Sequence, residues 1–362
     1  MSRRHKAGRR YKKHRLSRKY WIIAVSVSLL LITIGIWFYQ EVTGSKAATV
    51  WFETKAASSN LISLPKDDVP HQAKMEWWYY NGHLVAESGK KYSFHYTTFI
   101  VGNMTTMMVS HVSFADHHAK RHYIEQRRSA DIVPNTTANH FDFTSGDWRM
   151  SGGNGIDKLQ ASTPEFSFNF QLASTQPPVF QGKDGVISLD SAGSSYYYSR
   201  TRMAISGTVK IGGRTETVKG LAWFDHQWGD FSTPQLSWDW FSLQLDDNSD
   251  IMIYQLRDKS DNEVLYSGSI TQNGKTEILT SNDFSLSKSK KWVSNKTGIA
   301  YPIEWQFKVP AKNIDVTISS LLNDSEFDAT LTTYNIYWEG AVQVTGTHTG
   351  QGFMELSGYK KN

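Results

Sequence analysis

Two carboxylates, one imidazole and two indoles fall within eight residues of this chain, in the segment Trp223-Phe224-Asp225-His226-Gln227-Trp228-Gly229-Asp230. A carboxyl group in apolar surroundings has a raised pKa and can stay protonated. Indole faces stabilise a developing cation. These residue types therefore suit protonation of a hydrophobic, weakly basic substrate. The competing interpretation is structural: a strand end with aromatic core residues, in which Asp225 accepts hydrogen bonds.

The elements that must position these residues are strands. The segment continues a strand-like run from Thr215 to Ala222, and successive side chains on a strand point to opposite faces. We therefore expect one face to carry Trp223, Asp225 and Gln227. The opposite face then carries Phe224, His226 and Trp228.

Short strand candidates separated by turns fill the chain after Pro65. Apolar and polar residues alternate in residues 165–172, as expected for a half-buried strand. Turn signals lie at Gly212-Gly213, Asp246-Asp247-Asn248 and Asn273-Gly274. The candidates are Lys91–Val101, Thr105–Phe114, Glu165–Ala173, Met203–Ile211, Thr215–Phe224, Trp238–Leu245, Ile251–Arg257, Val264–Thr271, Tyr301–Val309, Ile314–Ser320, Tyr334–Thr345 and Gly352–Tyr359. The pattern predicts an all-β fold of antiparallel barrels or sandwiches.

The net charge of +5 comes from the N-terminus. Residues 1–20 contain six Arg and four Lys and no acidic residue, so the remainder of the chain is net acidic. The basic character therefore belongs to a tail, and we expect no nucleic-acid-binding surface. Cysteine is absent, which excludes disulfides, thiolate catalysis and cysteine-bound zinc.

The basic tail precedes an uncharged segment, Trp21–Tyr39, that is long enough to cross a bilayer as one helix. Aromatic residues at both of its ends are typical of membrane interfaces. The positive-inside rule then predicts a cytoplasmic tail at residues 1–20, an anchor at 21–39 and an external stalk at 40–64. The competing interpretation is a signal peptide cleaved near Ala47, which would release a secreted protein.

No phosphate-binding loop, paired-histidine zinc helix or nucleophile elbow occurs in the sequence. His117, His118 and His122 form a loose group that we interpret as polar loop residues rather than metal ligands. We therefore expect neither a metal nor another cofactor.

Five aromatic blocks, taken together, resemble one known family. They are Glu76–His83, Gly220–Gly229, Trp238–Leu245, Tyr337–Gly340 and Gly350–Tyr359. In this order and spacing, the chain from about Leu64 to Tyr359 resembles the AttH-like superfamily, which includes the carotenoid 1,2-hydratases (hydroxyneurosporene synthases) and fungal Diels–Alderases. The resemblance implies two tandem lipocalin-like antiparallel β-barrels, at residues 65–231 and 232–362, with a ligand cavity near their junction.

The resemblance also implies a ligand class and a chemistry. Members bind or act on large hydrophobic molecules such as isoprenoids and polyenes. In the hydratases an Asp protonates an isolated double bond, and water adds to the resulting tertiary cation without a cofactor. A His and a Trp separated by one residue belong to that site and correspond to His226 and Trp228, while the family's Tyr corresponds to Tyr254. Leu256 stands in the place of a family acid, and Asp258 lies two residues further on.

We therefore expect a membrane-anchored, external protein that binds a hydrophobic, isoprenoid- or polyene-like ligand. If it is an enzyme, we expect it to hydrate, isomerise or cyclise this ligand by acid catalysis without a cofactor. The alternative is a non-catalytic lipid carrier or envelope binding module, which the loss of the acid at Leu256 favours. The expected catalytic residues are Asp225, His226, Trp228 and Tyr254, with His226 sharing a proton with Asp225 or orienting it. The expected ligand-binding residues are Trp77, Trp78, Trp223, Trp238 and Trp240. For Glu76 and Glu339 we favour a structural role as acceptors of indole N–H hydrogen bonds.

Overall fold

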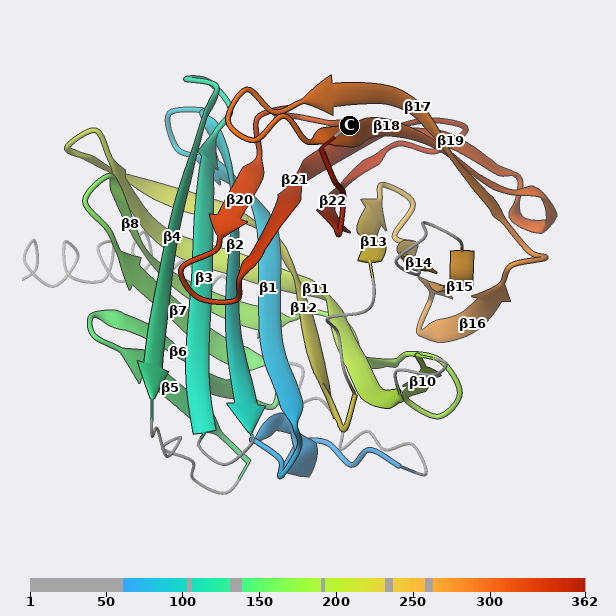
Figure 1. The fold of residues 1–362 in the computed structure, drawn as a ribbon, viewed down its shortest axis with the longest axis horizontal. Coiled ribbons are helices and arrows are strands. Elements are labelled where there is room, and N and C mark those ends of the chain that lie inside the picture. The colour runs from blue at the N-terminus through green and yellow to red at the C-terminus, as the bar shows by residue number, and fades with distance from the viewer. Residues whose placement is uncertain are drawn as a thin grey trace, which may run out of the picture. The chain divides into compact units, whose positions relative to one another are not determined.

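The computed structural model describes residues 61–102, 106–130, 139–189, 193–231, 237–257 and 263–361. In these residues the fold is all-β, as predicted, with two short 3₁₀ turns, η1 (Lys66–Asp68) and η3 (Pro310–Lys312). Antiparallel strands form two lipocalin-like sheets, and each sheet curls into a barrel-like or half-barrel shape (Figure 1).

The first sheet has 12 strands in the order β4-β3-β2-β1-β12-β11-β8-β7-β6-β5, with β9 and β10 paired to β11. Its strands are β1 (Met75–Ala86), β2 (Lys91–Gly102), β3 (Thr106–Asp116), β4 (Arg121–Ala130), β5 (Phe141–Ser145), β6 (Trp148–Gly153), β7 (Ile156–Ser162), β8 (Phe166–Ser174), β9 (Val179–Phe180), β10 (Val186–Ser188), β11 (Ser194–Ile211) and β12 (Arg214–Gly229).

The second sheet has ten strands in the order β16-β15-β14-β13-β22-β21-β19-β18-β17, with β20 paired to β21. Its strands are β13 (Ser237–Leu245), β14 (Asp250–Arg257), β15 (Glu263–Gln272), β16 (Lys275–Thr280), β17 (Ser285–Val293), β18 (Ala300–Val309), β19 (Ile314–Ser320), β20 (Glu326–Ala329), β21 (Asn335–Gly346) and β22 (Gly350–Ser357).

The hairpin turns form where the sequence predicted them. Gly212 and Gly213 have φ of 55° and 76°, and Asn273 and Gly274 have φ of 52° and 72°. Two successive residues with positive φ make the tight turn that matches the twist of paired strands. Asn248, in the turn between β13 and β14, also has a positive φ of 66°.

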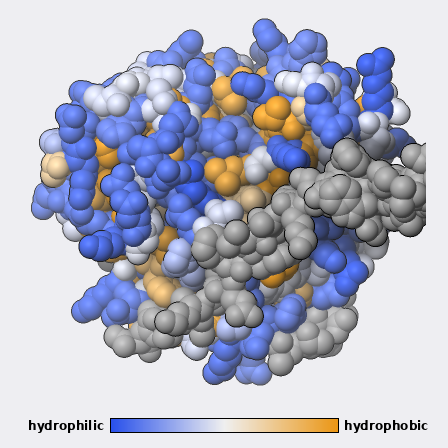
Figure 2. All heavy atoms as spheres, turned by 180° about the vertical axis from the view of Figure 1, so that it is seen from behind, coloured by the Kyte–Doolittle hydropathy of each residue, from blue (hydrophilic) through white to orange (hydrophobic). Residues whose placement is uncertain are grey.

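The described residues contain three large apolar clusters and a small one, formed by Phe327, Ala329 and Tyr337, against which Ile124 of the first sheet packs. One fills the first sheet and includes Trp78, Tyr80 and Phe224, and a second fills the second sheet around Trp305. The third lies between the sheets, and we call it the junction. There β21 and β22 lie against β2 and β1 (Figure 1). On the face shown in Figure 2, hydrophilic residues predominate and hydrophobic side chains appear between them.

The end strands of the first sheet, β4 and β5, are joined through a side chain. Arg127 on β4 donates from Nη1 to the carbonyl of Ser145 at the end of β5, with an N···O distance of 2.6 Å. The same nitrogen lies 2.7 Å from Asp147, and the guanidinium stacks over Trp148, which begins β6. One arginine therefore bridges the seam where the sheet returns on itself.

Several sequence predictions fall outside the described residues: the basic tail, the membrane helix at 21–39, the cleavage point near Ala47 and Asp258. Within the described ranges, no helix is long and apolar enough to span a membrane. The expected stalk ends before residue 64, because Ile62 and Leu64 are buried in the core of the first sheet.

Candidate functional site

Strand β12 places the predicted site residues on its two faces, and the predicted alternation is confirmed. Trp223 belongs to the junction, whereas Phe224 and Trp228 belong to the core of the first sheet. Asp225 and His226 therefore point in opposite directions. The expected contact between these two residues is absent, because adjacent residues on a strand cannot share a face; their hydrogen bonds run to different partners.

Asp225 faces the junction and is almost fully buried. Its carboxylate accepts hydrogen bonds from Tyr197 Oη at 2.6 Å, Ser199 Oγ at 2.6 Å and Trp223 Nε1 at 2.7 Å. Trp240 Nε1, from the second sheet, donates to Tyr197 Oη at 3.2 Å. Burial raises the pKa of Asp225 to about 7, although the three hydrogen bonds oppose the rise. The carboxyl thus lies within a network that ties the two sheets together.

A pair of glutamates on the second sheet also faces the junction. Glu339 on β21 and Glu355 on β22 lie directly opposite each other in the antiparallel register. Tyr79 Oη, from the first sheet, donates to Glu339 Oε1 at 2.5 Å, and His95 Nδ1 lies 3.2 Å from Glu339 Oε2. Directly opposed side chains lie close together on one face of a sheet, so two charges there repel each other.

Burial and mutual repulsion therefore favour protonation of this pair. Burial, with the charge of Glu355, raises the pKa of Glu339 well above its usual value. Burial and nearby Asp225 raise the pKa of Glu355 to about 7, against the hydrogen bond from Trp238. A carboxylic acid that holds its proton near neutral pH can act as a general acid.

The junction brings together most of the other predicted residues. Trp77, Trp223, Trp238, Trp240 and Tyr254 all belong to it, and so does Leu256. Trp240 packs edge-on against Tyr79 at a ring-centroid distance of 5.3 Å and against Trp223 at 6.3 Å. Indoles and carboxyls are thus interleaved in this layer.

His226 lies on the other side of β12, inside the first sheet. Its Nε2 is 2.8 Å from Glu76 Oε1, and its Nδ1 is 3.3 Å from Tyr198 Oη. Its ring stacks on Trp78 at 4.3 Å and tilts against Trp228 at 4.8 Å. The predicted residues His226, Trp78 and Trp228 therefore form a second group, separated from the junction by the sheet.

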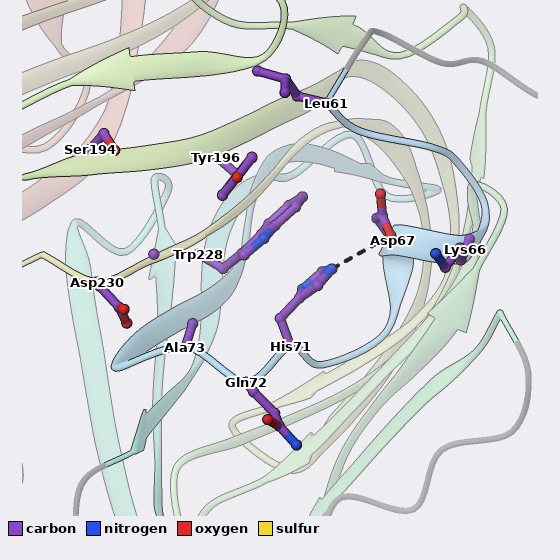
Figure 3. Close-up of a pocket in the computed structure, with 11 residues that line it drawn as sticks. Leu61, Lys66, Asp67, His71, Gln72, Ala73, Ser194, Tyr196, Trp228 and Asp230 are labelled. Carbon is purple, nitrogen blue, oxygen red and sulfur yellow. Dashed lines mark ion pairs between the residues drawn. The ribbon is translucent and has the colours of Figure 1, made fainter.

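A pocket of about 560 Å³ opens beside this second group. Tyr196, Trp228 and His71 line it and form a continuous stack, with ring-centroid distances of 5.3 Å and 4.0 Å (Figure 3). His71 Nδ1 lies 2.7 Å from Glu76 Oε1, so Glu76 contacts both His71 and His226. The pocket is therefore separated from His226 by one layer of side chains.

A buried ion pair lies deeper in the same sheet. Arg200 Nη2 is 3.1 Å and 3.2 Å from the two carboxylate oxygens of Asp68, and both residues are at most 2% exposed. Tyr198 Oη and the backbone N–H of Asn154 also donate to Asp68. These contacts fix η1 across the end of the first sheet.

Comparison with known proteins identifies the family. A family model described as AttH-like matches residues 55–359. The chain belongs to the AttH-like family. The predicted resemblance is thus confirmed over nearly all of the described residues.

Individual AttH-like relatives are more distant. The chain is 22% identical over 215 residues to dehydratase asqC of Emericella nidulans, covering 55% of this chain and 60% of that protein. It is 24% identical over 212 residues to kievitone hydratase of Fusarium solani subsp. phaseoli, covering 54% of this chain and 59% of that protein. The chain therefore matches about three-fifths of the length of each curated relative. A solved structure of an AttH described as putative, from Nitrosomonas europaea, has 29% identity and a TM-score of 0.76, covering 82% of this chain and 97% of the other.

Three residues of these groups in this AttH-like chain were not among the predicted catalytic and ligand-binding residues: His71, Glu339 and Glu355. His71 was not considered, because it precedes β1 in an irregular segment without a motif. Glu355 was seen only as part of an aromatic block, and Glu339 was interpreted as a structural acceptor. Their direct opposition depends on the register of β21 and β22. The signal that could have found them is a glutamate at the centre of each of the last two aromatic strands.

Proposed function

We propose that this AttH-like protein binds an isoprenoid- or polyene-like molecule at the junction and adds water to it, or removes water from it, by acid catalysis. The observation that carries the proposal is the opposed Glu339–Glu355 pair among the junction aromatics. The names of two relatives, a hydratase and a dehydratase, support the same reaction class. Glu355, which is partly exposed, supplies the acid that the family pattern lacks at Leu256.

The proposed step transfers the carboxylic proton of Glu355 to one carbon of a double bond. The other carbon becomes cationic, and Trp238 and Trp240 shield it through their indole faces. Water then attacks the cation and returns a proton to the carboxylate, so that the net change is addition of one water molecule. The reverse sequence eliminates water. Burial and the nearby carboxylate of Asp225 favour the acid form of Glu355.

A non-catalytic lipid carrier is the second candidate, and Leu256 at the position of the family acid favours it. Both functions use the aromatic residues of the junction. An enzyme of this class changes the mass of the bound molecule by one water, whereas a carrier releases its ligand with the same mass.

Label transfer from water distinguishes the two functions. We expect the purified full-length protein, incubated with the linear isoprenoid alkene squalene in H₂¹⁸O, to give an alcohol that carries the heavy oxygen. Mass spectrometry measures this product together with the lipids that co-purify. Squalene that is bound but unlabelled would support the carrier, and failure to bind any of these apolar molecules would contradict both functions.

We further propose that residues 21–39 anchor the protein in the cell membrane, with residues 1–20 in the cytoplasm and both sheets outside. The support is an uncharged segment of membrane length directly after ten cationic side chains. A hydrophobic ligand would then be available from the adjacent bilayer.

The full-length protein is expected to remain with membranes after a carbonate wash, because the apolar segment is buried in lipid. Protease added to intact cells should remove both sheets and leave a short fragment. Immunoblotting against tags at the two ends measures both results. Recovery of a soluble protein that begins at Ala48 would instead indicate cleavage.

A further inference from the structure

His71, Glu76 and His226 form a compact group that the proposed acid chemistry does not use. One potential ligand atom from each residue lies within 4.8 Å of the others. Among the residues that the structure describes, this is the one such group of three or more His, Cys, Asp or Glu side chains. His71 lies between η1 and β1, and Glu76 lies on β1. His226 lies on β12, 150 residues after Glu76.

In one tautomer of His226, a close contact of this group lacks a hydrogen atom. Tyr198 Oη donates its single hydrogen to Asp68, so its oxygen accepts from His226 in the tautomer that carries a hydrogen on Nδ1. In a neutral imidazole the other nitrogen, Nε2, then carries a lone pair. That lone pair faces a carboxylate oxygen of Glu76 at 2.8 Å. A positive species between the two atoms would satisfy both of them.

The surroundings of the group match those of a metal site. His71 Nε2 has no hydrogen-bond partner in the described structure, and Asp67 Oδ1 lies 3.7 Å away (Figure 3). Tyr198 Oη lies within hydrogen-bond distance, 3.3 Å, of the second nitrogen of His226. Oxygen groups behind the ligating histidines hold the rings in orientation at metal sites.

We propose that His71 Nδ1, Glu76 Oε1 and His226 Nε2 bind a divalent transition-metal ion, with zinc as the best match. Two imidazoles and one carboxylate are a donor set that zinc accepts, and three protein ligands leave a position for water. His71 lines the 560 Å³ pocket, so the ion would be reached from that pocket. The site is separate from the junction, on the opposite face of β12, and it does not depend on the proposed acid catalysis.

Zinc binding to the full-length protein tests the proposal. After treatment with a chelator and dialysis, we expect titration calorimetry and elemental analysis to show one zinc ion per chain. His71→Ala and Glu76→Gln should each weaken binding by about a hundredfold or more, because each removes a ligand. His118→Ala and Glu165→Gln change exposed residues of the same types and should leave the affinity unchanged.

Cobalt provides a second measurement that is independent of any activity. We expect Co²⁺ bound to the wild type to show the visible absorption of a four-coordinate site, and His71→Ala to lose it. Because His71 is partly exposed, this variant should fold even if Glu76→Gln does not; circular dichroism checks both. Absence of stoichiometric zinc in the wild type, or retention of zinc by His71→Ala, would overturn the proposal. Equal loss in His118→Ala would assign binding to surface histidines and also overturn it.

Discussion

Replacing Glu355 by glutamine is expected to reduce turnover of a squalene-like alkene by about a hundredfold or more, with little change in binding affinity. The amide keeps the size and polarity of the side chain but cannot give up a proton to a double bond. The label incorporated from H₂¹⁸O per unit time measures turnover, and retention of squalene by the protein measures affinity.

The wild-type activity should also depend on pH in a defined direction. Because burial raises the pKa of Glu355 to about 7, the acid form predominates below that pH and activity should fall as the pH rises through it. The same raised pKa means that the folded state binds the proton more tightly than the unfolded state. The contribution of this protonated glutamate to the free energy of unfolding is therefore complete below the ordinary glutamate pKa of 4.5. It is lost as the pH rises toward about 7.

The exposed Glu165 offers a matched control, since Glu165→Gln makes the same chemical change away from the junction. This variant should keep wild-type turnover and the wild-type pH profile. If Glu355→Gln also kept both, Glu355 would be excluded as the acid. Unchanged turnover with a lost pH dependence would likewise show that the group does not donate the proton.

Replacing Arg200 by methionine is expected to lower the free energy of unfolding by about 3–5 kcal/mol. The variant keeps a long side chain but leaves the buried carboxylate of Asp68 without its cation. Tyr198 and the backbone of Asn154 would still donate to Asp68, but neither carries a charge. Chemical unfolding of the full-length protein, followed by tryptophan fluorescence, measures the change.

Arg149→Met is the control for this prediction. Arg149 also makes two hydrogen bonds to one carboxylate, that of Asp142, at 2.8 Å and 2.7 Å, but its side chain is 55% exposed. This substitution should lower the free energy of unfolding by less than about 1 kcal/mol, because water replaces the exposed ion pair. The double variant Asp68→Leu with Arg200→Met should be more stable than Arg200→Met alone. Equal losses for Arg200→Met and Arg149→Met would contradict this account of the buried pair.

The fold was predictable in some of the strands that have one polar face, although β7, which also alternates, was not predicted. Apolar and polar residues alternate in residues 165–172, and the structure forms β8 at Phe166–Ser174. Strand β1 was not predicted as a strand, because one of its faces packs inside the first sheet and the other packs at the junction. A strand buried on both faces loses its alternation. Strand β17 was missed for the opposite reason, since nearly all of its residues are exposed.

The sequence predicted which face of β12 each candidate residue occupies, but not the residues that it contacts. Alternation along β12 correctly assigned Asp225 and His226 to opposite faces, but the partners of each residue come from other strands. Glu76 reaches His226 from 150 residues away, and Glu339 meets Tyr79 from 260 residues away. These contacts depend on how the sheets curl and on how they pack together. Neither property is encoded in the spacing of residues within one segment.

Only the backbone of strand β12 separates the junction on one face from the interior of the first sheet on the other. Any sideways displacement of this strand moves Asp225 on one side and His226 on the other. An ion held at His226 and a molecule held at the junction would then be linked thermodynamically: if the ion tightens or weakens binding of the molecule, the molecule changes the affinity for the ion by the same factor. In that case β12 would separate the two sites and also transmit the effect of binding at one site to the other.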